Sequence, residues 1–168
     1  MILRRAGVDD AEMLSAIAVA TYTETFGDSY PAQDLHDFLQ AHYSPAVQRA
    51  ELADERTAVW LLEECGRAVG YLAAGPNGLP HPLAVEGDIE LKRLYLLASH
   101  QNAGHGVRMM DAFVAWLDAP VRRTLWIGVW SENFGAQRFY ARHGCCKVGE
   151  YDFIVGASHD REFILRRP

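Results

Sequence analysis

The order of apolar and polar positions is most informative between residues 89 and 117. Residues 89–96 (IELKRLYL) are a short, mostly apolar run that ends at a polar turn sequence, as a buried strand does. Beyond Gly106, apolar side chains return at helical spacing, at Val107, Met110, Phe113, Val114 and Leu117. The pattern therefore predicts a buried strand, a tight polar loop and an amphipathic helix.

The same reasoning assigns the other elements. Short apolar runs predict strands at 2–5, 57–63, 68–74, 125–130, 144–155 and 162–166, of which 57–63 and 68–74 form a hairpin. Capping residues and helical spacing predict helices that begin near Asp9, near Asp34, at Pro45 and after Asn133. On the first helix, Met13, Ile17 and Ala20 should face the core. Residues 75–88 carry glycines and prolines and predict a surface loop.

Composition and charge narrow the function classes. At 168 residues, the chain suits one domain, residues 1–168, with a sizeable core. No apolar run approaches the ~18 residues of a membrane span. The N-terminus also lacks the apolar region of a signal peptide, so we expect a cytoplasmic protein with no membrane partner. A formal net charge of −6 argues against a nucleic-acid partner and leaves cationic substrates open.

The cysteines and histidines of this sequence show neither a disulfide pattern nor a metal-binding pattern. Cys65, Cys145 and Cys146 do not build a disulfide framework, so we expect reduced thiols. Adjacent Cys145 and Cys146 could supply a nucleophile, but no base is argued beside them, and small buried thiols are the favoured interpretation. The histidines show no ligand spacing with carboxylates or cysteines, which predicts no metal.

The loop between strand 89–96 and the following helix is a candidate anion site. Small residues before a helix start leave backbone N–H groups unpaired at the positive end of the helix dipole, where phosphates bind. An ordinary strand-to-helix turn explains the loop as well. A P-loop would need Lys and Ser or Thr where Val107 and Arg108 stand, and a dinucleotide fingerprint would need a third glycine at Met109. Both are poor fits.

Two spaced motifs carry a family resemblance. Gln101-Asn102-Ala103-Gly104-His105-Gly106 has the spacing Gln-x-x-Gly-x-Gly after a strand, and it resembles the acetyl-CoA pyrophosphate loop of the GNAT (Gcn5-related) N-acetyltransferases. Residues 133–144 (NFGAQRFYARHG) resemble that family's second signature, Asn-x-x-Ala-x-x-Phe-Tyr-x-x-x-Gly. The resemblance covers residues 1–166. It implies an α/β fold of the α+β type, with a mixed, mostly antiparallel central sheet flanked by helices and splayed at the coenzyme A cleft.

The resemblance also implies which residues bind acetyl-CoA. Backbone groups of Leu94, Tyr95 and Leu96 would pair with the pantetheine arm and polarise the thioester carbonyl. The loop amides and the helix start would bind the pyrophosphate through Gln101, Asn102, Ala103, Gly104, His105, Gly106 and Val107. Asn133 would contact the pantetheine arm, although it is equally well explained as a helix cap. Asn102 stands where glycine is common, but Asn tolerates left-handed geometry.

Acetyl transfer to an amine needs a base and an acid. An alkylamine has a pKa near ~10, so about one molecule in a thousand is neutral at pH 7, which costs roughly 4 kcal/mol of barrier. Glu90 is the candidate base, on the face of its strand that also carries Lys92 and Leu94; a salt-bridged strand carboxylate is the alternative. Tyr140 matches the family tyrosine that protonates the leaving thiolate, with a plain core aromatic as the alternative.

The acceptor is the least determined part. Phe26 and Tyr30 lie where resembling enzymes build one wall of the acceptor site, and they are equally well explained as core. We expect direct attack by a small cationic amine, with a peptide amine as the nearest alternative. A non-catalytic coenzyme A sensor and a nucleotide-binding regulator are the rivals from other classes. Many resembling enzymes form homodimers, and the sequence leaves that state open.

Overall fold

The computed structural model describes residues 1–168 except for the side chains of Val155 and Ser158. Its strands are β1 (Ile2–Arg5), β2 (Ala58–Glu64), β3 (Arg67–Pro76), β4 (Ile89–Leu96), β5 (Leu125–Trp130), β6 (Cys146–Val155) and β7 (Ser158–Arg167). Its helices are α1 (Ala11–Phe26), α2 (Ala32–Tyr43), α3 (Pro45–Ala53), α4 (His105–Leu117) and α5 (Phe134–Arg142). Short 3₁₀ turns lie at η1 (Val8–Asp10), η2 (Gly27–Ser29) and η3 (Ala98–His100).

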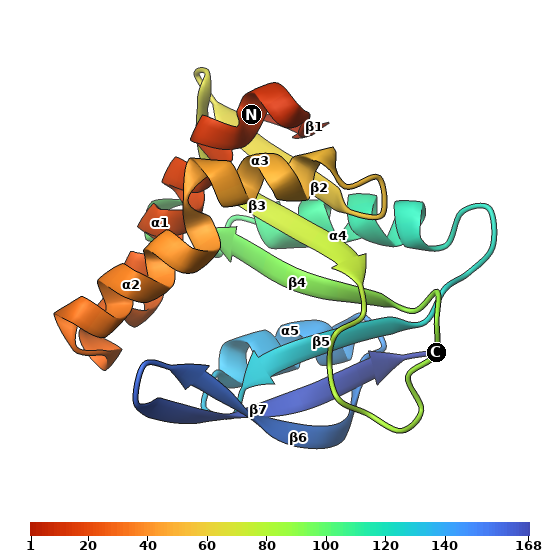
Figure 1. Ribbon diagram of the computed structural model, residues 1–168. Coiled ribbons are helices and arrows are strands. Elements are labelled where there is room, and N and C mark those ends of the chain that lie inside the picture. The colour runs from red at the N-terminus through yellow and green to blue at the C-terminus, as the bar shows by residue number, and fades with distance from the viewer.

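The strands form one sheet in the order β1-β2-β3-β4-β5-β7-β6 (Figure 1). Neighbouring strands run antiparallel except β4 and β5, which are parallel. These two pair only from Ile89 opposite Leu125 to Leu91 opposite Ile127. Beyond that point they diverge, as Figure 1 shows, so the expected mixed sheet and its splay are confirmed.

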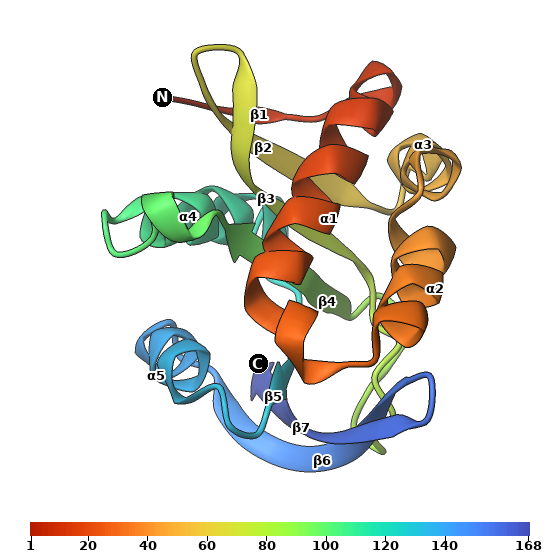
Figure 2. The ribbon, with the colours of Figure 1, turned by 90° about the vertical axis from the view of Figure 1, so that its left-hand side faces the viewer.

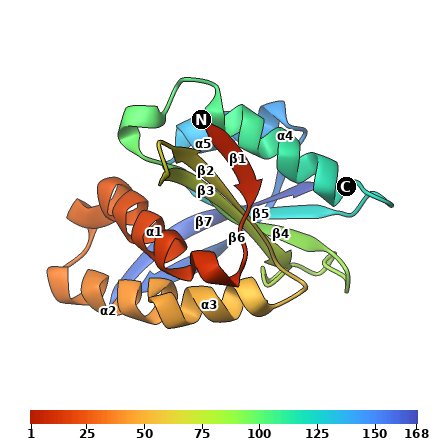
Figure 3. The ribbon, with the colours of Figure 1, turned by 90° about the horizontal axis from the view of Figure 1, so that it is seen from above.

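Helices cover both faces of this sheet. Figures 2 and 3 show α1, α2 and α3 on one face and α4 and α5 on the other. Each face of the sheet has its own hydrophobic core. The core under α1 contains Leu14, Ile17 and Tyr22 of that helix together with Tyr71 of β3, and the core under α4 contains Met110. Among the described residues, no helix has both the length and the apolar character needed to cross a membrane.

A β-bulge corrects the predicted facing of β4. The register with β3 shifts between Ala73 and Ala74, which lie opposite Arg93 and Leu91, so Lys92 has no cross-strand partner. Leu91 and Leu94 therefore pack against the same core, whereas Tyr95 joins the core under α1. Strict alternation, which grouped Glu90 with Leu94, was wrong because one extra residue reverses the facing downstream.

Several element boundaries also differ from the sequence expectation. Asp10, not Asp9, precedes α1, and its Oδ2 accepts the Gly7 N–H at 2.8 Å. Helix α2 begins at Ala32, so Asp34 lies inside its first turn. Ala20 is exposed, because the buried face of α1 runs through Leu14, Ile17, Ala18, Thr21 and Tyr22.

The hairpin of β2 and β3 and the single strand β5 agree with the prediction. The helical turn expected from Pro45 is a full helix, α3. Strand β7 begins at Ser158, four residues earlier than the expected 162. Cys145 is buried as expected, but Cys146 is exposed. Burial raises the pKa of the Cys145 thiol to about 11, which disfavours the reactive thiolate.

Candidate active site

The loop after β4 has the backbone geometry that an anion site needs. Asn102 and Gly104 adopt left-handed conformations, with φ of 60° and 81°, and Gly104 is the residue that precedes α4. Within the described part of the chain, no hydrogen bond reaches the backbone N–H groups of residues 102–107. These consecutive donors at a helix N-terminus are available to an anionic ligand.

Two side chains of this loop make contacts inside the protein. The Gln101 Nε2 donates to the Leu96 carbonyl at 3.1 Å, which ties the loop to the end of β4. His105 is half-buried, with its ring centroid 6.5 Å from that of His100, whose Nε2 lies 3.1 Å from Glu64. Ala103 and Val107 are exposed. The Gln101 side chain is engaged by the Leu96 carbonyl, and Ala103 and Val107 carry no polar side-chain group. The backbone N–H groups are therefore the groups of this loop that can bind an anion.

A narrow crevice of about 90 Å³ opens where β4 leaves β5. Its walls come from β4, β5, α5 and neighbouring residues, and they include Leu94, Tyr95, Asn133 and Tyr140 among those that the sequence singled out. Asn133 caps α5, with its Oδ1 accepting the Ala136 N–H at 3.0 Å, and also faces the crevice. The structure thus brings the end of the β4 strand next to the second signature motif.

Tyr140 lies on α5 at this crevice with a relative exposure of 8%. Burial raises the pKa of its phenol well above the usual value, so the hydroxyl stays protonated at neutral pH. The same burial would raise the pKa of a thiolate placed beside it. A protonated phenol facing a desolvated crevice can therefore serve as a proton donor.

A larger cleft of about 1040 Å³ adjoins the crevice. Phe26, Tyr95 and Trp130 line both spaces, and the Phe26 ring meets the other two edge-on at centroid distances of 6.5 and 6.2 Å. Tyr30 also lines the large cleft, and its hydroxyl donates to Asp160 of β7. The two residues expected at the acceptor wall thus lie in one cleft with the predicted base.

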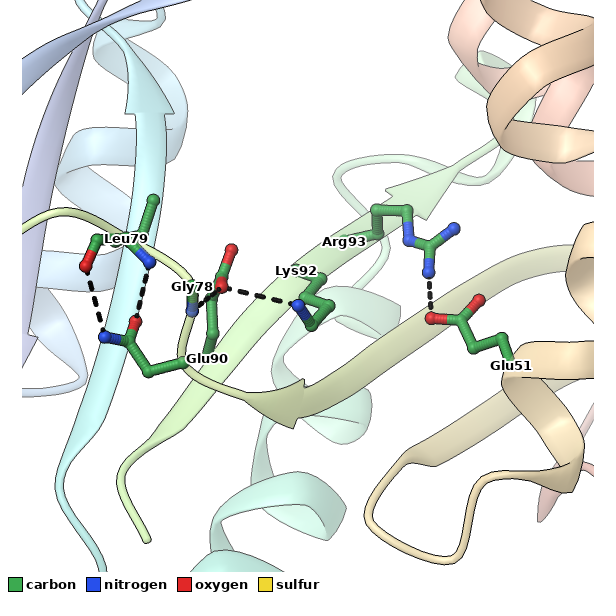
Figure 4. Close-up of polar contacts among 7 residues, drawn as sticks. Glu51, Gly78, Leu79, Glu90, Lys92 and Arg93 are labelled. Carbon is green, nitrogen blue, oxygen red and sulfur yellow. Dashed lines mark hydrogen bonds and ion pairs between the residues drawn. The ribbon is translucent and has the colours of Figure 1, made fainter. Parts of the chain in front are cut away.

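Glu90 lines this cleft from β4 (Figure 4). Its Oε2 accepts the Gly78 N–H at 2.9 Å and lies 3.5 Å from the Lys92 Nζ. Farther along the strand, Arg93 pairs with Glu51 of α3, as Figure 4 shows. The ion pair that was the alternative for Glu90 is therefore present, while its carboxylate still borders the cleft.

The sequence reasoning missed a second carboxylate, Glu162 of β7. Glu162 lines both the large cleft and the crevice, and its Oε2 accepts a hydrogen bond from the Tyr151 hydroxyl of β6. Burial raises the pKa of Glu162. Residue 162 was expected only as a strand start. No local pattern marks it, because its position depends on Gly128 of β5, which is distant in the sequence, as well as on Tyr151, its cross-strand partner in the β6–β7 hairpin.

More acidic than basic side chains line the large cleft. Its acidic members are Glu51, Asp54, Glu90, Asp152, Asp160 and Glu162, and its basic members are Arg56, Lys92 and Arg93. Glu51 and Asp54 are paired with arginines, and Glu90 with Lys92. Among the described side chains, Asp152, Asp160 and Glu162 have no cationic partner. This excess of negative charge favours a cationic ligand. The described residues contain no cluster of His, Cys, Asp and Glu suited to a metal.

Comparisons with known proteins agree with this geometry. Residues 13–145 match the model of the acetyltransferase (GNAT) family. An uncharacterized N-acetyltransferase of Mycobacterium bovis is 29% identical over 161 residues, covering 94% of this chain and 97% of the relative. Another, from Lactobacillus delbrueckii subsp. lactis, is 26% identical over 152 residues, covering 90% and 88%.

Solved structures share the fold. The PaiA N-acetyltransferase of Thermoplasma acidophilum, in complex with coenzyme A, superposes with a TM-score of 0.78 at 15% identity, covering 99% of this chain and 97% of that one. The ribosomal-protein-S18-alanine N-acetyltransferase of Escherichia coli has a TM-score of 0.73 at 14% identity, with coverages of 99% and 92%. At such identities the likeness concerns the fold.

Proposed function

The chain belongs to the GNAT family of acetyltransferases, and from that membership we propose that it transfers the acetyl group of acetyl-CoA to a small cationic primary amine. The observation that carries this proposal is the junction of two spaces at Tyr95 and Trp130. A narrow crevice reaches Tyr140, and a wide cleft with excess negative charge opens beside it. A thioester in the crevice and an amine in the cleft would meet there.

The backbone of the loop after β4 supports the coenzyme part. Unpaired N–H groups of residues 102–107 suit a pyrophosphate, and the unpaired edge of β4 at Leu94, Tyr95 and Leu96 suits the amide-rich pantetheine arm. The fold neighbour from Thermoplasma acidophilum was solved with coenzyme A, which supports the same ligand here. Acetyl-CoA, when bound, supplies the activated acyl group.

The chain's own residues would then act on protons and charge. Tyr140 is the proposed acid, which gives its phenolic proton to the departing sulfur. A backbone N–H near Leu96 would stabilise the negative charge that develops on the thioester oxygen. Glu90, the base expected from the sequence, borders the acceptor cleft and stays a prediction. Direct attack is favoured over an acyl-enzyme, because the buried Cys145 has a raised pKa and Cys146 is exposed and outside the cleft.

The walls of the cleft support a cationic acceptor. Aromatic rings, among them Phe26 and Tyr30, provide apolar and cation–π surface, while Asp152, Asp160 and Glu162 provide negative charge. A peptide amine needs room for a backbone on both sides of its side chain, or for residues beyond an N-terminus. Small amines need only the charge and the rings.

The test is release of free thiol from acetyl-CoA across a panel of polyamines, amino acids and short peptides. We expect turnover with small amines that carry a positive charge beyond the reacting nitrogen. Turnover limited to peptides would make the chain a peptide N-acetyltransferase and overturn the small-amine assignment. Tight coenzyme A binding with no turnover on any acceptor would support the sensor instead. Displacement of coenzyme A by ATP would support the nucleotide regulator.

The proposal extends to the cellular location and the assembly. Three cysteines without a disulfide among them suit a reducing compartment, so the cytoplasm stays the proposed location. The homodimer common among resembling enzymes stays a prediction, which light scattering of the purified protein would test.

A further inference from the structure

We infer that the Glu162 carboxylate, rather than that of Glu90, takes the proton from the acceptor amine. This inference rests on the proposed acetyl transfer and assigns one residue role within it. Three features carry it: the position of Glu162 between the two spaces, the hydrogen bond that fixes its carboxylate, and the contacts that already occupy Glu90.

The position of Glu162 fits a group that meets both substrates. Its side chain lines the crevice that contains Tyr140 and also the wide acceptor cleft. Glu90 lines the wide cleft alone. An amine that attacks a thioester in the crevice places its nitrogen at the junction, so a carboxylate that borders both spaces is well placed to take its proton directly.

The absence of a side chain at Gly128 in the neighbouring strand β5 leaves space for this carboxylate. Gly128 of β5 has no side chain, and a Cβ there would lie 2.8 Å from the Glu162 Oε2 and 2.8 Å from the Tyr151 hydroxyl oxygen. The Glu162 carboxylate therefore fills the space over β5 that a side chain at 128 would take. Strand β5 borders the splay from β4, so this space faces the junction.

Tyr151 holds the carboxylate without neutralising it. Its hydroxyl donates to the Glu162 Oε2, and among the described residues no other hydrogen bond reaches this carboxylate. The Oε1 of Glu162 is left for a ligand. Glu90, by contrast, has one oxygen engaged by the Gly78 N–H and by the Lys92 ammonium, so an approaching ammonium would compete with Lys92.

The electrostatic surroundings also suit a base. Burial raises the pKa of Glu162, and the nearby carboxylates Asp160 and Glu90 raise it further, while the Tyr151 hydrogen bond lowers it. Of the other charged or titratable groups at the cleft, Lys92 pairs with Glu90 and Tyr30 donates to Asp160. A carboxylate with a raised pKa accepts a proton from an ammonium more readily than an ordinary one.

The protons balance across the reaction. Glu162 removes one proton from the bound ammonium, and the freed lone pair forms the new C–N bond. As the C–S bond breaks, the sulfur keeps the electron pair and takes the phenolic proton of Tyr140. The nitrogen loses its second proton, which restores the Tyr140 phenol through solvent. Glu162 releases its proton to bulk water, so one proton leaves for each acetyl group transferred.

The test compares Glu162→Gln with the native protein on an acceptor found in the panel. Gln keeps an oxygen for the Tyr151 hydroxyl but cannot take a proton. We expect kcat to fall roughly 100-fold while the coenzyme A Kd stays unchanged. Because a base must be ionised to work, the native kcat/KM should rise with pH through the Glu162 pKa. In Glu162→Gln that rise should move to higher pH, toward the pKa of the amine itself.

A less basic analogue of the same acceptor, with fluorine on the second carbon from the nitrogen, sharpens the test. A larger fraction of such an amine is already neutral, so the ratio of native to Glu162→Gln rates should shrink. If Glu162 only bound the cation, the variant would raise the acceptor KM and leave kcat and the pH profile in place. That result would overturn the inference.

Three further variants serve as controls. Glu150→Gln, on an exposed residue of β6 that pairs with Lys147, should change nothing. Tyr151→Phe removes the hydrogen bond that lowers the Glu162 pKa, so the rise with pH should shift modestly upward with a smaller loss of kcat. Glu90→Gln removes a carboxylate that raises the Glu162 pKa, so the rise with pH should persist and shift modestly to lower pH. If Glu90→Gln instead moves the rise toward the pKa of the amine and Glu162→Gln does not, Glu90 is the base and the inference is wrong.

The failure of this inference is distinct from failure of the proposed function. Native protein without turnover on any amine would end the acetyl-transfer proposal itself. Native turnover with an unchanged Glu162→Gln rate would end only the assignment of the base. Should Glu162→Gln not fold, as judged by thermal melting, Glu162→Asp replaces it. Shortening the side chain by one methylene should lower kcat at least tenfold, and an unchanged kcat would overturn the inference.

Discussion

The proposed coenzyme region and the proposed acceptor cleft meet at Tyr95, yet they are built in different ways. The coenzyme region is a continuous stretch, from the end of β4 through the loop to the start of α4, and it offers main-chain N–H groups. The acceptor cleft draws side chains from both halves of the sheet and from α1, α2 and α3. One region depends on backbone geometry and the other on assembled side chains.

This difference explains which region a sequence motif can report. Backbone donors persist through side-chain changes, provided that a few positions allow left-handed geometry and close approach. Asn102 illustrates this tolerance, since it adopts the left-handed conformation with φ of 60°. A cleft made of side chains has no such local signature. Substitutions should therefore separate the two regions, affecting either coenzyme affinity or acceptor chemistry.

Tyr140→Phe should have the largest effect at the junction of the two regions. Loss of the acid should lower kcat roughly 100-fold and leave the coenzyme A Kd unchanged, because the ring still fills its buried site. Stopped-flow thiol release and calorimetric titration measure the two quantities. Tyr71→Phe, on a fully buried tyrosine of β3, is the matched control and should keep native turnover. Equal turnover in Tyr140→Phe would remove the acid role.

Gly128→Ala should disturb the acceptor side alone. The new Cβ would force apart the hydrogen-bonded pair of Glu162 and Tyr151, each 2.8 Å away. Misplacing the base should lower kcat roughly tenfold, with no change in coenzyme A affinity. Gly7→Ala, where a Cβ meets nothing within 4 Å, is the control and should be silent. If Gly128→Ala weakened coenzyme A binding and left kcat unchanged, the two regions would not be separate in function.

Gly104→Val should disturb the coenzyme side alone. A β-branched residue at φ of 81° is strained, by about 1–2 kcal/mol, so the loop amides should shift and weaken coenzyme A binding about fivefold. Gly66→Val at φ of 76°, in the turn of the β2–β3 hairpin, carries the same strain far from the loop. Both variants should lose similar unfolding free energy, but Gly66→Val should keep the native Kd. Equal Kd values in the two variants would contradict the anion site.

Tyr30→Phe should give the smallest effect. It removes the hydroxyl that donates to Asp160 while keeping the ring in the cleft. Loss of one such hydrogen bond costs about 0.5–1 kcal/mol, so the acceptor KM should rise two- to fivefold. Initial-rate kinetics should show native kcat and a native KM for acetyl-CoA. A changed KM for acetyl-CoA would place Tyr30 outside the acceptor cleft.

Particular residues show how much of the candidate site could be predicted from the sequence. The loop from Gln101 to Gly106 and the motif around Tyr140 were predicted because each is local, and the structure places them side by side, since a Cβ on Gly106 would lie 3.7 Å from the Phe139 ring. The facing of β4 was mispredicted, since its bulge depends on the register with β3. Glu162 was missed altogether, because its relation to Gly128 and Tyr151 exists only once three strands are paired.

The sequence by itself determined the elements, the order in which they follow one another and the two motifs at 101–106 and 133–144. Those features depend on hydrophobic period and on residues adjacent in the chain, which short-range geometry governs. Only the tertiary structure decided the splay of β4 from β5, the acidic cleft beside it and the pairing of Tyr151 with Glu162. Strand register and burial set these features, because they fix which side chains meet and how strongly their charges are felt.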